Sequence, residues 1–381
     1  MTADSPELVC PFTGGDATPT SISRVRTATG DQAWKVTGYR KVKELFTDVR
    51  LGRSHPTPET AARSSESVFF GRPFGNFETE PADNARMRGL LNPMFSAKRM
   101  RELTPRVAAF TTQLLDDMAE QGSPADLHKA FAEPLPLLVI SELLGVPYED
   151  RAQFRAWSEA LFDTSDGAKS GQAGAEWFLY CKSLVERRRR EPGEGVIAKL
   201  CEVPDLPDDA IATLSMGLLL AGHETTVVEI GLCTVQLLRN PAQWQKLVQR
   251  PELIPGAIEE LLRVHDSTAF ARYARTDMEI DGVTVRTGDL VLLDVDSANH
   301  DPEIFTNARQ LDVTRAEGQH LAFGYGLHYC TGAPLARIEL QVAFGQLISR
   351  FPTLHLTVDP DTLPVRENVV TKGLTALPVA W

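Results

Sequence analysis

The chain has 381 residues, is 43% hydrophobic and carries a formal net charge of -12 at pH 7. Its length and apolar content allow a large buried core, and its acidic balance argues against non-specific binding to nucleic acid, which needs a basic surface. Its 5 cysteines are scattered without metal-ligand spacing and no signal-peptide pattern precedes them, which predicts a cytoplasmic protein.

Two further absences bear on the organisation of the chain. No apolar run approaches the roughly 18 residues that a membrane span needs, so we expect no membrane anchor. No Ser/Gly-rich linker divides the sequence, so we expect a single domain over residues 1–381.

The predicted elements begin with a strand at residues 32–37 and are then mainly helical from about residue 84 to residue 263. The run Arg187 to Arg190 predicts a solvated helix C-terminus. The longest helix begins after Leu206-Pro207-Asp208-Asp209 and stops at Asn240-Pro241. It has about 30 residues and a length of about 45 Å at 1.5 Å per residue. Its centre, residues 216–221, is apolar on all sides, which predicts burial.

Strands return after residue 263. Residues 278–280 and 283–285 flank Asp281-Gly282, a two-residue hairpin signal. A further strand is predicted at 290–295 and a helix at 331–349. The fold class is therefore mainly α with a small β-rich lobe.

Three polar or ionisable residues, His223-Glu224-Thr225, follow Gly222 and interrupt the apolar centre of the longest helix. Burying them costs free energy unless they have partners. Gly222 would let a flat cofactor approach the helix, and His223 is expected to be structural. A satisfied polar kink without any chemistry is the alternative.

Glu260 and Arg263 lie three residues apart on one predicted helix face. If exposed, such a pair contributes only ~0.2–0.5 kcal/mol. The pair is informative because it lies in the sequence between the polar helix segment and the cysteine loop described next.

Cys330 lies in a glycine-rich run, residues 323–332, directly before a predicted helix. One thiolate is too few for zinc or an iron–sulfur cluster, which take about four ligands, but it suffices as the proximal ligand of a haem iron. The N-terminus of the following helix would lower the thiol pKa. A buried, inert cysteine in a glycine-rich turn is the alternative.

The pattern F-G-x-G-x-H-x-C-x-G around Cys330 resembles the haem-binding loop of the cytochrome P-450 family. The order of the polar helix segment, the Glu260–Arg263 pair and the loop is also similar, and the resemblance covers nearly the whole chain. It implies the cytochrome P-450 fold, with haem b between the long helix and the loop. Cys330 would bind the iron, with Phe323, Gly324, Gly332, Ala221 and Gly222 beside the cofactor.

The resemblance also implies roles for the polar residues. Glu224 and Thr225 match the acid and the alcohol that deliver protons to bound dioxygen. Glu260 and Arg263 would join Arg315 in a buried structural network. The haem carboxylates would contact Arg88, Arg272, His328 and Asn84, although Asn84 stands where relatives often have His and carries no charge. An axial histidine, His320 or His328, is the competing ligand.

The implied function is a haem-thiolate monooxygenase that uses O2 and NAD(P)H-derived electrons, supplied by a ferredoxin and its reductase. It would hydroxylate or epoxidise a mid-sized organic substrate of secondary metabolism, including antibiotic biosynthesis, and act as a monomer. Arg86 and Lys98 are candidates for the ferredoxin-docking face. The alternatives are oxidative coupling, desaturation or peroxide-driven oxidation on the same fold, and a non-catalytic haem sensor or storage protein.

By the same resemblance the substrate pocket is mixed aromatic, aliphatic and small polar, which suits an apolar molecule with a few polar groups. Its expected lining is Phe69, Phe70, Phe77, Phe162, Leu218, Leu219, Thr268, Ala269, Phe270, Val369 and Val370.

Overall fold

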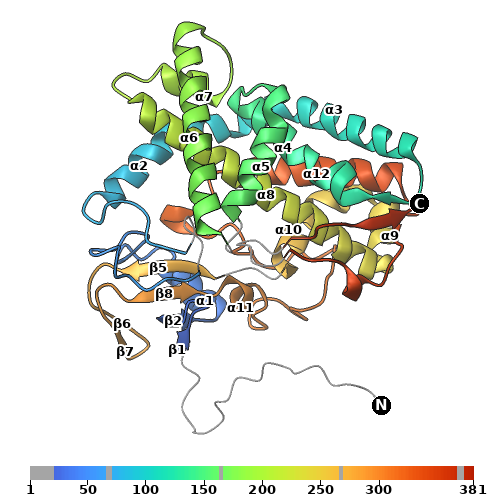
Figure 1. The fold of residues 1–381 in the computed structure, drawn as a ribbon. Coiled ribbons are helices and arrows are strands. Elements are labelled where there is room, and N and C mark those ends of the chain that lie inside the picture. Colours follow the sequence, from blue (N-terminus) through green and yellow to red (C-terminus); the bar gives the residue numbers. More distant parts are fainter. Residues whose placement is uncertain (1–20, 66–70, 163–165, 266–268, 367–372) are drawn as a thin grey trace.

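The structure, a computed structural model, describes residues 21–65, 71–162, 166–265, 269–366 and 373–381. Helices make up most of it, and a five-stranded sheet lies to one side, at the lower left of Figure 1. The expected mainly α fold with a small β-rich lobe is confirmed.

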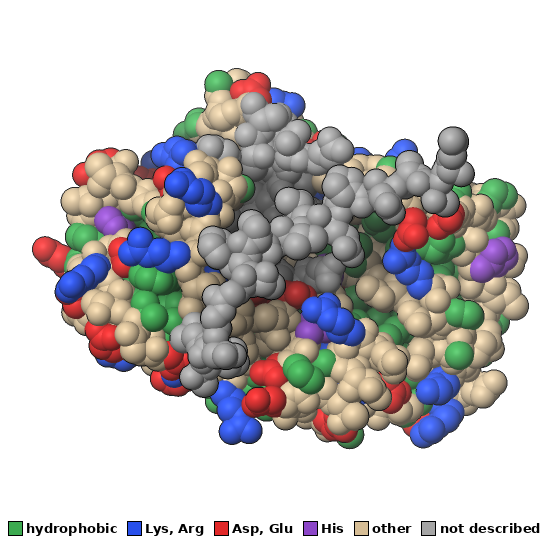
Figure 2. Space-filling view, turned by 90° about the horizontal axis from the view of Figure 1, so that it is seen from below, with side chains coloured by type: hydrophobic (Ala, Val, Ile, Leu, Met, Phe, Trp, Pro, Cys, Tyr) green, Lys and Arg blue, Asp and Glu red, His purple; other side chains and the backbone are tan. Residues whose placement is uncertain are grey.

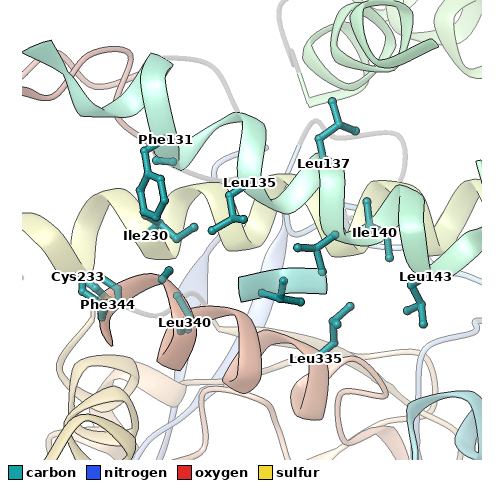
Figure 3. Packing of buried hydrophobic residues seen from close by; sticks show 14 of the residues in the cluster. Phe131, Leu135, Leu137, Ile140, Leu143, Ile230, Cys233, Leu335, Leu340 and Phe344 are labelled. Atoms are coloured by element: carbon teal, nitrogen blue, oxygen red, sulfur yellow. The ribbon is translucent and has the colours of Figure 1, made fainter. Parts of the chain in front are cut away.

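The long helix α8, Asp208–Arg239, lies in the middle of the helical part. It begins after Pro207 with two aspartates in its first turn and ends at Asn240 before a proline, as its helix signals predict. Helices α4 (Pro134–Leu144), α6 (Gly167–Arg190) and α12 (Ala333–Arg350) pack against it. Figure 3 shows the apolar side chains of α4, α8 and α12 meeting in the largest core cluster.

The remaining helices surround this centre. They are α1 (Tyr39–Leu45), α2 (Glu80–Leu91), α3 (Ala97–Gln121), α5 (Arg151–Phe162), α7 (Val196–Cys201), α9 (Pro241–Gln249), α10 (Ile254–Val264) and α11 (Val295–Asn299). A π-helical turn, His128–Ala132, leads into α4. Helices α10 and α12 pack on each other, which brings the end of the cysteine loop close to α10.

The main sheet has the strand order β1-β2-β8-β5-β3. Its strands are β1 (Ile22–Arg26), β2 (Gln32–Val36), β8 (Leu290–Leu293), β5 (Phe270–Ala274) and β3 (Leu51–Gly52). The hairpin β6 (Met278–Ile280) and β7 (Val283–Val285) forms with the predicted bounds, and Ile280 pairs with Val283. A second core cluster joins this sheet to α1 and α11.

Some elements differ from the sequence prediction. A small sheet, β4 (Ala125–Asp126), β10 (Pro378–Ala380) and β9 (His355–Leu356), was not predicted, because strands of two or three residues are too short to show a period. In the arginine run, Arg190 is exposed as predicted. Arg188 instead donates a 2.8 Å hydrogen bond to the carbonyl of Gly145 at the end of α4.

Helix α8 is long and apolar enough to cross a membrane by length and composition alone. However, 67% of its most apolar window is buried inside the protein, as in the central helix of a folded domain. Its apolar character is therefore accounted for by core packing.

Candidate active site

The loop that carries Cys330 is a tight turn closed by its own backbone. The Cys330 N–H donates a 2.9 Å hydrogen bond to the carbonyl of Phe323. Gly324 and Gly326 have φ values of 68° and 65°, in the left-handed region that favours glycine. The turn leaves the Cys330 side chain exposed on one side. It therefore presents one accessible thiol immediately before α12.

Opposing effects act on the Cys330 thiol. Burial of its surroundings raises its pKa, while hydrogen bonds from the backbone N–H groups of Gly332 and Ala333 and the charges of Arg88 and Arg337 lower it. The net shift is upward, so the helix N-terminus does not by itself produce a thiolate. A bound metal ion would ionise the thiol directly.

A stripe of small residues is exposed along the middle of α8. Gly217, Ala221 and Thr225 follow each other at intervals of four, on one helix face, and all are exposed although most of their neighbours are buried. The Thr225 hydroxyl donates a 2.8 Å hydrogen bond to the Ala221 carbonyl. Exposed positions in the centre of a core helix indicate an internal space beside it.

Gly222 does not belong to this stripe, which corrects the expectation that it admits a cofactor. A Cβ atom there would lie 2.7 Å from Cδ1 of Ile140 on α4. The missing side chain therefore allows α4 to pack closely on α8. Leu218 is half-buried next to the stripe, whereas Leu219 is buried in the main core.

Glu224 is buried, and its carboxylate forms an ion pair with Arg366. It therefore lies on a different side of α8 from the exposed Thr225, and the two side chains do not bond to each other. His223 is also buried, and its Nε2 has no hydrogen-bond partner among the described residues. Burial lowers the pKa of His223 to about 4.

Cationic side chains gather around a single carboxylate, Glu80. Arg272 is only 5% exposed, and burial, with the nearby Arg53, lowers its pKa to about 10. Burial, with Arg272 and Arg53, likewise lowers the pKa of His328 to about 4. His328 Nε2 lies 3.8 Å from Glu80 Oε1. Burial outweighs the attraction of Glu80 for Arg272, so this buried cation can accept a further anion, whereas His328 is neutral and can donate a hydrogen bond.

Glu80 is already engaged by the protein. Burial would raise its pKa, but hydrogen bonds from the Ser54 hydroxyl and from the backbone N–H groups of Arg53 and Ser54 outweigh burial and lower it. Arg275 also pairs with it at 3.1 Å. The cluster thus has room for further negative charge.

The two residues on α2 that are expected to contact the haem carboxylates also hold the cysteine loop. Arg88 Nη1 donates to the carbonyl of Tyr329 at 2.8 Å, and Asn84 Nδ2 donates to the carbonyl of Leu327 at 3.2 Å. They are four residues apart on one face of α2. Arg53, which no local motif marks, is a further cation near Arg272.

The structure brings the expected Glu260 network together. Arg263 donates to both carboxylate oxygens of Glu260, at 2.7 and 2.9 Å, and Arg315 Nε lies 3.0 Å from Oε2. Glu260 and Arg263 are 3% and 2% exposed. Arg263 also donates to the carbonyls of Asn299 and Ala308, so this network joins α10 to the segment before the cysteine loop.

The pocket residues are only partly described. Phe77 packs under the Arg275 guanidinium, 4.4 Å from the ring centre, and Phe270 packs edge-on against Phe46. Ala269 is exposed. Outside the described residues lie Phe69, Phe70, Thr268, Val369 and Val370, as does the side chain of Phe162.

These features fit haem b. A single accessible thiol, an exposed small-residue stripe and a cationic cluster short of anions match its iron, its flat face and its two carboxylates. Among the residues that the structure describes, no group of three or more His, Cys, Asp or Glu side chains could hold a metal ion without such a cofactor.

Comparisons with known proteins agree with this geometry. The family model for cytochrome P450 matches residues 197–375. The chain is 39% identical to pentalenolactone synthase of Streptomyces exfoliatus, over 94% of this chain and 93% of the relative. It is 38% identical to mycinamicin IV hydroxylase/epoxidase of Micromonospora griseorubida, over 94% and 92%.

Solved structures extend the match to the fold. The cytochrome P450 of the Bacillus subtilis 168 bacillaene polyketide synthase superposes with a TM-score of 0.85 at 34% identity, covering 95% of this chain and 94% of its own. The chain belongs to the cytochrome P450 family. It is a monooxygenase that uses haem b, O2 and NAD(P)H-derived electrons, takes these electrons from redox partners and binds a small substrate.

Proposed function

We propose that this enzyme hydroxylates or epoxidises a mid-sized secondary metabolite, with electrons from a ferredoxin and its reductase. The proposal rests above all on the Cys330 loop, which exposes one thiol beside a cationic cluster. The named activity of the Micromonospora relative, a hydroxylase/epoxidase, supports the reaction type.

Cys330 is the residue that would bind the haem iron, and Arg53, Arg272 and His328 would hold the haem carboxylates. When bound, haem b supplies the centre at which dioxygen is activated and one oxygen atom is passed to the substrate. Binding of the ionised haem carboxylates would supply the negative charge that Arg272 and Arg53 lack. Ala221 would lie beside the flat face of the cofactor.

Thr225 and Glu224 are proposed to deliver protons. Thr225 exposes its hydroxyl on the α8 stripe, where the hydroxyl can pass a proton to an oxygen species in the cavity. Glu224 has to release Arg366 before its carboxyl group can carry a proton toward Thr225. Arg366 is therefore proposed to control when Glu224 takes part.

The electron donor would dock on the side of the cysteine loop. Arg86 on α2 and Lys98 on α3 are both exposed, and basic side chains there would attract an acidic ferredoxin. On the face shown in Figure 2, Lys and Arg side chains are interspersed with Asp and Glu. We further propose that the 381 residues form one domain and act as a monomer in the cytoplasm.

Product analysis tests the reaction type. Turnover with ferredoxin, reductase and a candidate macrolide or terpenoid under labelled dioxygen should add one labelled oxygen atom to the product. A product that has lost hydrogen without gaining oxygen would instead indicate coupling or desaturation. In Thr225→Ala, electrons should be diverted from product to hydrogen peroxide, and unchanged coupling would contradict the role of Thr225.

A further inference from the structure

Two consecutive glutamates of α10 face different partners. Glu260 holds Arg263 and Arg315, as described above. Glu259 binds Arg337 of α12 through two parallel hydrogen bonds, Nε to Oε1 at 2.7 Å and Nη2 to Oε2 at 2.9 Å. This bidentate geometry is the most directional form of an arginine–carboxylate pair. Glu259 thus fixes the plane of the Arg337 guanidinium.

The same guanidinium contacts both ends of the cysteine loop. Arg337 Nη1 donates a 2.8 Å hydrogen bond to the hydroxyl of Tyr329, the residue before Cys330. Its Cζ lies 4.7 Å from the ring centre of Phe323, whose carbonyl accepts the Cys330 N–H. The rings of Phe323 and Tyr329 are 6.4 Å apart in an edge-on arrangement. Arg337 therefore braces the turn in which Cys330 sits.

His320 completes this arrangement. Its Nδ1 accepts a 3.1 Å hydrogen bond from the Ala322 N–H, so the ring proton is on Nε2. Nε2 lies 3.1 Å from Oε2 of Glu259 and donates to it. Both ring nitrogens are occupied by protein, which leaves His320 no lone pair for an axial bond to iron.

We propose that Arg337, oriented by Glu259 and His320, is a positioning residue that keeps the Cys330 sulfur in place as the iron ligand. The proposal rests on the proposed function, because it requires Cys330 to bind haem. Arg337 would not touch the cofactor itself. It would limit the freedom of Tyr329 and Phe323, and through them the direction of the Cys330 side chain.

The ferrous–CO spectrum of the purified haem-loaded enzyme tests this proposal. Thiolate ligation gives a Soret band at long wavelength, and loss of the thiolate moves it to shorter wavelength. At sub-denaturing urea concentrations, this conversion should be about tenfold faster in Arg337→Leu than in the wild type, since charge-assisted hydrogen bonds are lost. Arg337→Lys keeps the positive charge but not the planar guanidinium that makes two parallel hydrogen bonds. Its conversion rate should therefore lie between those of the wild type and Arg337→Leu.

Matched variants separate bracing from general stability. Tyr329→Phe removes only the accepting hydroxyl and should accelerate the conversion less than Arg337→Leu. Arg106→Leu breaks a similar pair, to Glu142 at 3.0 Å between α3 and α4, and should leave the conversion rate unchanged. Arg337 also binds Tyr329, so Arg337→Leu should shift the urea midpoint of helix loss at least as far as Arg106→Leu does. The conversion rates are therefore compared at urea concentrations equally far below the midpoint of each variant.

The outcomes are distinguishable. A wild type without the long-wavelength band would refute Cys330 ligation and with it the proposed function. If the wild type shows the long-wavelength band, and Arg337→Leu and Tyr329→Phe convert no faster than the wild type, the brace alone is overturned. If Arg337→Leu fails to bind haem, the conversion rates of Tyr329→Phe and Glu259→Gln are used, because both variants keep the arginine. Rates above that of the wild type support the brace, and rates equal to it overturn the brace.

Discussion

The close packing of α8 on α4 predicts that Gly222→Ala destabilises the protein. A Cβ at this position would lie 2.7 and 2.9 Å from Cδ1 and Cγ1 of Ile140, closer than carbon atoms pack. Overpacking of this kind costs about 1–3 kcal/mol. Replacing a helix-interior glycine by alanine gains about 1 kcal/mol from propensity. The expected net loss of unfolding free energy is therefore about 0–2 kcal/mol.

A double-mutant cycle isolates the contact. In an Ile140→Ala background the nearest remaining atom, Cβ, lies 3.5 Å away, an ordinary contact. There Gly222→Ala should stabilise the protein by about 1 kcal/mol, so its sign reverses. Gly171→Ala, inside α6, is the matched control, because a Cβ at 171 meets nothing within 4 Å and the residue lies outside the proposed haem site.

Urea unfolding of the haem-loaded protein, followed by circular dichroism, measures these differences. The reasoning is refuted if Gly222→Ala behaves like Gly171→Ala and shows no coupling to Ile140. Weakened haem binding by Gly222→Ala at unchanged stability would restore the original expectation that Gly222 faces the cofactor.

Three further predictions concern buried charges. The pKa of His223 is about 4 in the folded protein and 6.5 in the unfolded protein, so the unfolded protein binds the proton more readily. The free energy of unfolding therefore keeps its full value above about pH 6.5 and declines as the pH falls toward 4. The loss of up to about 3 kcal/mol over this range should be smaller in His223→Leu, and identical urea midpoints against pH would contradict the assignment. Arg366→Leu should change the product formed per NAD(P)H and its pH profile, whereas Arg366→Lys should retain both; equal coupling in all three enzymes would exclude control of Glu224. Arg263→Leu should lower the free energy of unfolding by about 3–5 kcal/mol, because it leaves the buried Glu260 carboxylate with one fewer partner. A decrease below about 1 kcal/mol in urea unfolding would contradict this.

Local sequence signals predicted the backbone of the site well. The hairpin at 278–285, the bounds of α8 and the helix after Cys330 all follow from turn residues, caps and proline, which act within a few residues. The cysteine loop is recognisable for the same reason. Its glycines occupy positions at which the turn requires a positive φ.

Pairings between distant side chains could not be predicted in this way. Arg366 reaches Glu224 across 142 positions, and Arg337 reaches Glu259 across 78. Neither arginine lies in a pattern that indicates its partner, because only the packed elements bring them together. Gly222 illustrates a related limit. A glycine in a buried helix indicates close approach, but the sequence does not say that the approaching group is Ile140.

The ferrous–CO difference spectrum of the wild-type protein and Cys330→Ala tests the central claim most directly. The wild type should show the long-wavelength Soret band of thiolate-ligated haem, and Cys330→Ala should lose it while keeping its helix content. A short-wavelength, imidazole-type band in the intact wild type, or an unchanged band in Cys330→Ala, would contradict the assignment of Cys330 as the iron ligand.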